Sequence, residues 1–111
     1  MKITHNKLVR DNIPEIIESC GKSCKTHVLD SSEYIVALKD KLLEESKEVM
    51  EASDLDSIIG ELADVMEIVR SIESYYDIDP SVVESKRISK GSKNGHFNDR
   101  IFLEYVIEED K

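Results

Sequence analysis

Two long segments with helically spaced apolar residues, joined by a very short turn, constrain the fold of this chain more than any other feature. The first segment carries its apolar residues at Ile35, Leu38, Leu42 and Val49. The second carries them at Ile58, Leu62, Val65, Val69, Ile72 and Tyr76. These steps place side chains on one face of a helix. Because only Ala-Ser-Asp separates the segments, the two helices must pack in antiparallel directions.

Capping signals set the expected limits of four helices. The expected caps are Asn12, Ser31 or Ser32, Asp54 or Asp56, and Asp79. They predict a short helix that begins at 13–14 and stops at Gly21, and long helices ending near residues 52 and 76. A last helix begins at Pro80 and ends near Gly91.

The expected fold is one all-α domain over residues 1–111, built as a helical bundle. A chain of 111 residues is long enough for one core but too short for two. Residues 24–29 and 100–107 alternate weakly between apolar and polar, so the bundle has room for a small β-ribbon formed by these two segments.

Charge and hydropathy exclude two classes of partner. The formal net charge of −9 argues against nucleic acid held by charge alone, because phosphate binding needs clustered Lys and Arg. No apolar run approaches the ~20 residues of a membrane-spanning helix, so no membrane partner is expected. The only cysteines, Cys20 and Cys24, have neither a zinc nor a thioredoxin spacing, which predicts free thiols in a reducing cytoplasm.

Residues 42–67 contain nine carboxylates, and some of them fall on the helix faces that should be buried. At 100° per residue, Glu45 lies inside the apolar stripe of its helix and Glu48 borders it. Glu61 lies at the edge of the second stripe, and Asp64 is next in line. Antiparallel packing would bring these four together, and they repel one another unless a cation lies between them. Ordinary acidic margins on two amphipathic helices are the alternative.

The remaining acids of the two helices have routine positions on the solvent side or flank, namely Glu51, Glu67 and Glu73. Histidine is absent from both helices, because His5, His27 and His96 all lie elsewhere. An all-oxygen ligand set suits a hard cation, most simply Mg²⁺, with Mn²⁺ as a substitute.

Basic residues concentrate at the two ends of the chain, on either side of the acidic centre. Lys7 and Arg10 lie in an N-terminal stretch without acids, and Lys86, Lys90 and Arg100 lie in a C-terminal stretch whose only acid is Asp99. This arrangement can hold a metal cation together with a polyphosphate. An ordinary solvated surface would have the same composition.

The spacing Glu44-Glu45-x-x-Glu48, followed after twelve residues by Glu61-x-x-Asp64, resembles the signature of the MazG-like all-α nucleoside triphosphate pyrophosphohydrolases. The superfamily includes phosphoribosyl-ATP pyrophosphohydrolase. The stretches NKLVRDNIPEII (6–17) and KLLEE (41–45) resemble a small house-cleaning branch of it. Residues 94–100, NGHFNDR, resemble its N-x-K-F-x-x-R element, with His96 at the position of the lysine.

The resemblance implies hydrolysis of a nucleoside triphosphate to the monophosphate and pyrophosphate. Residues expected to hold Mg²⁺ are Glu45, Glu48, Glu61 and Asp64, and the candidates for general base are Glu44 and Glu45. Phosphate-neutralising candidates are Lys7, Arg10, Lys86, Lys90 and Arg100. Phe97 or Tyr34 is the candidate for stacking on the base.

Two readings without catalysis remain: a helical interaction module, and a nucleotide-binding sensor without turnover. A second apolar stripe, formed by Val36, Leu43 and Met50, repeats every seven residues on the first long helix. Exposed apolar patches mark partner surfaces, so the stripe predicts a homodimer or a dimer of dimers. Residues 1–29 or the C-terminal strand could instead cover the stripe within one chain.

Overall fold

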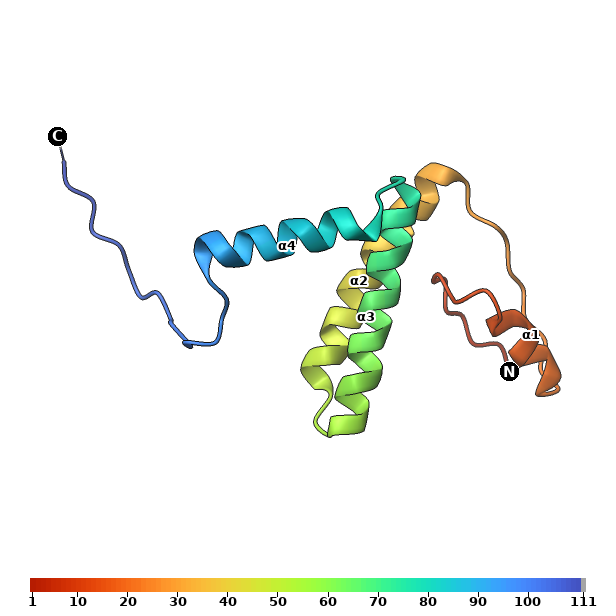
Figure 1. Cartoon of the computed structure of the whole chain (residues 1–111). Helices are drawn as coiled ribbons and strands as arrows, with labels where there is room; N and C mark the ends of the chain where they lie inside the picture. Colours follow the sequence, from red (N-terminus) through yellow and green to blue (C-terminus); the bar gives the residue numbers. More distant parts are fainter. Residues whose placement is uncertain (111) are drawn as a thin grey trace. The chain divides into compact units, whose positions relative to one another are not determined.

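The structure is a computed structural model that describes residues 1–110. It contains the helices α1 (Ile13–Ser19), α2 (Ser31–Glu51), α3 (Leu55–Tyr75) and α4 (Pro80–Asn94), shown in Figure 1. Within residues 1–110 there is no β-strand, so the predicted all-α fold is confirmed. None of the helices in this range combines the length and the hydropathy that crossing a bilayer requires.

The β-ribbon that alternation allowed for residues 24–29 and 100–107 does not form in the described part of the chain. Both segments are irregular. An isolated two-stranded ribbon is marginal in water unless it packs on a further strand or a helix, so weak alternation alone does not produce one.

Carboxylate caps begin the three longer helices. The Asp30 side chain accepts a hydrogen bond from the Glu33 backbone N–H at 2.8 Å, and Glu33 Oε1 accepts one from the Asp30 N–H at 3.3 Å. This reciprocal capping box begins α2, where Ser31 or Ser32 was the expected cap. Asp54 and Asp79 cap α3 and α4 as the sequence predicted. Asn12 precedes α1 without making a side-chain cap bond.

The end of α4 differs from the expectation. The helix runs through Gly91 and ends at Asn94, and Gly95 follows with φ +84°. Glycine inside a helix costs only about 1 kcal/mol relative to alanine, so Gly91 does not stop the helix. The helix ends at Gly95 because its positive φ is not a helical conformation. Glycine suits this position, since residues with a Cβ rarely adopt such a φ.

Contacts within the chain fall into two groups, residues 1–78 and the residues from 79 onward. In the first group α2 and α3 pack along their length as an antiparallel hairpin (Figure 1). The core of this hairpin centres on Leu38 and Ile68, which are 3% and 6% exposed. Near the end away from the turn, the rings of Tyr34 and Tyr75 lie with their centroids 6.1 Å apart.

Both helices of the hairpin also carry exposed apolar residues. On α2 these are Val36, Leu43 and Met50, the last two 74% and 87% exposed. On α3 they are Leu55, Ile59, Leu62 and Met66. Leu62 and Tyr76 were expected in the buried stripe, but each keeps about half of its surface exposed. Two helices alone can bury only the sides that face each other, so these residues are left on the surface.

Candidate functional site

Three carboxylates from the two hairpin helices converge at one point. Glu45 of α2 and Glu61 and Asp64 of α3 each offer an oxygen, and these oxygens lie within 4.8 Å of one another. The three-residue spacing on α3 puts its two acids on one face, and antiparallel packing brings Glu45 opposite them. We refer to Glu45, Glu61 and Asp64 as the acidic cluster.

Burial and mutual repulsion raise the pKa of Glu61. The largest cause is desolvation, followed by a hydrogen bond with Glu45 and by the negative charges of Glu45, Asp64 and Glu48. Glu45 is only 9% exposed, and its nearest cation is Lys41, with 3.7 Å between Nζ and Oε1. Carboxylates this close cannot all ionise freely, so the cluster favours either a proton or a cation between the oxygens.

Glu44 and Glu48, the other two predicted acids, lie around the cluster. Glu48 is exposed and is outside the three converging oxygens, yet its charge contributes to the raised pKa of Glu61. Glu44 pairs with two lysines, at 3.5 Å from Lys7 and 3.6 Å from Lys41. The structure therefore brings three of the four predicted metal ligands together and places Glu48 near them.

The N-terminal basic residues reach the same place. Arg10 Nη2 lies 2.7 Å from Asp64 Oδ1, and Lys7 pairs with Glu44, next to Glu45 in the chain. Both pairs join residues far apart in sequence, so tertiary packing creates them. Lys7 and Arg10 of the N-terminal stretch therefore border the acidic cluster.

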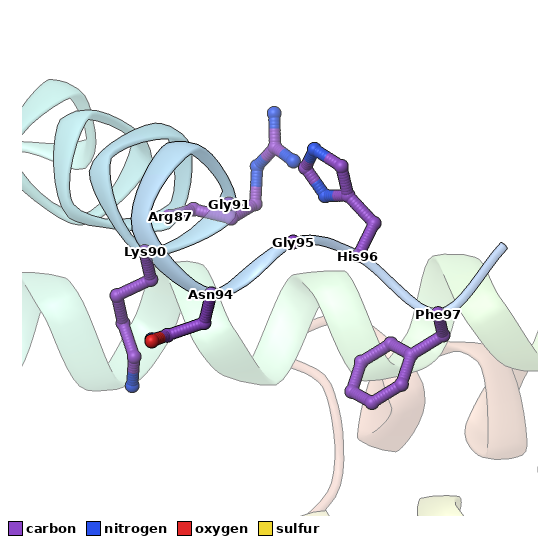
Figure 2. Close-up of a pocket in the computed structure, with 7 residues that line it drawn as sticks. All are labelled: Arg87, Lys90, Gly91, Asn94, Gly95, His96 and Phe97. Atoms are coloured by element: carbon purple, nitrogen blue, oxygen red, sulfur yellow. The ribbon is translucent and has the colours of Figure 1, made fainter. Parts of the chain in front are cut away.

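The C-terminal candidates belong to the residues from 79 onward. Lys90 and Phe97 line a pocket of about 540 Å³, together with Arg87, Gly91, Asn94, Gly95 and His96 (Figure 2). The pocket is open to solvent, because Phe97 is 97% exposed and most of the other lining residues are exposed as well. Lys86 and Arg100 do not line the pocket, and both are exposed.

His96 holds its place because Gly91 has no side chain. Figure 2 shows His96 folded back towards the last turns of α4. A Cβ at Gly91 would lie 2.9 Å from His96 Nε2, which is closer than real Cβ atoms come. Arg87 in the same pocket pairs with Glu84. Neither Arg87 nor His96 was singled out as a binding residue from the sequence.

Glu73 was also misjudged from the sequence. The prediction that Glu73 lies on the solvent side or flank of its helix is wrong, because Glu73 is only 3% exposed. Arg70 donates to Glu73 Oε1 at 2.9 Å, and Oε2 has no hydrogen-bond partner among the described residues. The signal was present in the periodicity, since Glu73 follows Val69 of the apolar stripe by four residues and so lies only ~40° from it on the helix.

The donor set of the acidic cluster fits a hard cation. All three groups are carboxylates, which Mg²⁺ and Ca²⁺ prefer, whereas structural zinc sites recruit Cys or His. His5, His27 and His96 do not belong to the cluster. Both cysteines are free, and neither belongs to it.

The raised pKa of Glu61 predicts a stability that depends on pH in the metal-free protein. The folded state holds the Glu61 proton more tightly than the unfolded state, so stability falls as pH rises from the ordinary carboxyl value through the raised one. Glu61→Gln removes this penalty. We expect it to raise the thermal midpoint at pH 7, and to raise it much less at pH 4, in calorimetry without divalent cations. Glu67→Gln, at an exposed position of α3, is the matched control and should show neither effect. A Glu61→Gln midpoint equal to wild type at pH 7 would contradict the repulsion.

Comparison of the chain with protein-family models, with curated protein sequences and with solved structures finds no match in any of the three.

Proposed function

We propose that this protein hydrolyses a nucleoside triphosphate to the monophosphate and pyrophosphate, with Mg²⁺ as cofactor and Mn²⁺ as a possible substitute. The observation that supports this most directly is the convergence of Glu45, Glu61 and Asp64 within 4.8 Å, with Arg10 and Lys7 beside them. Carboxylates and cations packed at one place suit a substrate that carries both a metal and phosphates. The motif resemblance in the same residues points to the same reaction.

In this proposal Glu45, Glu61 and Asp64 hold the cation, and Glu48, whose charge acts on Glu61, is the fourth ligand. A cation held there would neutralise phosphate charge and lower the pKa of an attacking water. It would also relieve the repulsion that contributes to the raised pKa of Glu61.

Glu44 is the best-supported general base. It adjoins Glu45 in the chain and lies outside the three converging oxygens, where it pairs with Lys7 and Lys41 and would accept a proton from water once one of these pairs opens. Glu45 is the other candidate. Lys41 Nζ lies 3.6 Å from a Glu44 oxygen and 3.7 Å from a Glu45 oxygen, so its charge offsets part of theirs.

Phosphate contacts are assigned to Lys7 and Arg10, which border the acidic cluster. Lys86, Lys90 and Arg100 stay candidates for the same work on the basis of charge alone. Phe97 is exposed in the pocket that Lys90 lines, which suits stacking on a base. The two free thiols are typical of a reducing cytoplasm, where we place the reaction.

A non-catalytic role as a helical interaction module is the second candidate. The exposed apolar residues on α2 and α3 favour it, because contiguous apolar surface marks a partner site. It explains the apolar surface but gives no reason for three carboxylates to converge. Turnover separates the two functions.

The test is product identification. Purified protein with Mg²⁺ and a panel of ordinary and damaged nucleoside triphosphates should release the monophosphate and pyrophosphate from at least one of them, in a chromatographic assay. Omission of Mg²⁺ or addition of a chelator should stop the reaction. Release of orthophosphate with the diphosphate as the first product would contradict the proposed bond cleavage, and no turnover of any nucleotide would favour the interaction module.

A further inference from the structure

The N-terminal segment of the chain is held on the acidic cluster by charge. Arg10 donates a hydrogen bond from Nη2 to Asp64 Oδ1 at 2.7 Å, across 54 residues of sequence. Lys7 forms a second pair with Glu44. The Arg10 carbonyl also accepts the N–H of Ile13 at 3.1 Å, which ties this segment to the start of α1. Two ion pairs therefore connect this segment to the hairpin, and one of them is made to a member of the acidic cluster.

Arg10 and a divalent cation compete for the same carboxylate. A cation bound to Asp64 would sit ~2.1 Å from one of its oxygens. The guanidinium already contacts one Asp64 oxygen at 2.7 Å, so the two positive charges would lie roughly 6 Å apart. At that separation their repulsion weakens cation binding roughly tenfold in water. Arg10 is more than half exposed, so it can leave Asp64 without being stranded in an apolar environment.

We propose that Arg10 is an exchangeable counter-ion of the acidic cluster. It neutralises Asp64 in the metal-free protein, leaves it when the cation binds, and is then available to a phosphate of the substrate. A guanidinium binds phosphate oxygens with two parallel hydrogen bonds, so the released side chain has a stronger acceptor to move to. The inference rests on the proposed function, because it takes the cation and the phosphate from that reaction.

If Arg10 exchanges in this way, removing its charge should strengthen the binding of Mg²⁺ and weaken the binding of pyrophosphate. Arg10→Met keeps an unbranched, flexible side chain and removes its charge. Mg²⁺ alone should bind this variant roughly tenfold more tightly than wild type, the factor for a unit charge about 6 Å from a divalent ion in water. Inorganic pyrophosphate should bind the Mg²⁺-loaded variant more weakly than the loaded wild type. A residue that only supports the fold would weaken both.

Isothermal titration of both probes decides the matter. Lys2→Met is the matched control, since Lys2 lies in the same N-terminal stretch and forms no ion pair among the described residues; it should bind both probes like wild type. Arg10→Lys should restore Mg²⁺ affinity to near the wild-type value, and helical circular dichroism checks the fold of each variant. Equal or weaker Mg²⁺ binding by folded Arg10→Met overturns the exchange alone. Absence of Mg²⁺ binding by the wild type overturns the proposed metal site, and the exchange with it.

Discussion

Asp64→Asn is expected to abolish release of pyrophosphate while leaving the helices intact. Asparagine has nearly the shape of aspartate but lacks the charge that would hold a cation, and Asp64 supplies one of only three converging oxygens. Since loss of even an outer-shell group at a metal site costs 10–100-fold, loss of a direct ligand should lower kcat/KM by at least roughly a hundredfold. The measurement is initial rate at saturating Mg²⁺ with whichever nucleotide the wild type hydrolyses.

The fold should tolerate this change. Asp64 is half-buried, and its partner Arg10 is exposed enough for water to solvate the guanidinium once the ion pair is lost. Asp56→Asn makes the same chemical change at an exposed position in the first turn of α3 and should retain wild-type activity. Retention of full activity by Asp64→Asn would remove the acidic cluster from the chemistry.

The hairpin and its acidic cluster were predictable because the information is local. Apolar spacing defines each helix, the three-residue turn dictates the antiparallel direction, and the angular position of Glu45 in its stripe predicts that it is buried. The 9% exposure of Glu45 and its convergence with Glu61 and Asp64 confirm this reasoning. For the N-terminal segment, the sequence predicted that basic residues concentrate there, but not which acids they contact. The pairing of Arg10 with Asp64 depends on how the segment packs, which the sequence does not display.

Some predictions were wrong because two local signals competed, or because the predicted structure needs a neighbouring segment. Asp30 rather than a serine caps α2, because Glu33 completes a reciprocal capping box with it. Gly91 resembled a helix end, but the positive φ falls at Gly95. Residues 100–107 have strand-like alternation, yet alternation does not supply the neighbour that a strand requires. Leu62 matched the buried spacing, and only the structure shows that the hairpin leaves it exposed.

The exposed apolar side chains of α2 and α3 lead us to propose a homodimer, or a dimer of dimers, built on the hairpin. Val36, Leu43 and Met50 follow one line along α2, and Leu55, Ile59, Leu62 and Met66 follow one line along α3. Two hairpins that buried these lines against each other would form a four-helix arrangement with an apolar core, a stable way to cover such stripes. Within residues 1–78 no segment covers the stripe on α2, since Leu43 and Met50 are largely exposed there.

Leu43→Glu is therefore expected to split the dimer. Each buried leucine contributes about 1.5–3 kcal/mol, and a twofold interface loses two of them, so the dissociation constant should rise by at least roughly a hundredfold. Multi-angle light scattering at micromolar concentration would show a particle of twice 12.7 kDa for wild type and of 12.7 kDa for the variant. Val28→Glu, at an exposed apolar residue outside both lines, should leave the dimer intact. A wild-type particle of 12.7 kDa at high micromolar concentration would rule the dimer out. Leu43→Glu could be monomeric and also bind Mg²⁺ less tightly than wild type. In that case the hairpin of the partner subunit helps to hold α2 and α3 in the register that the acidic cluster requires.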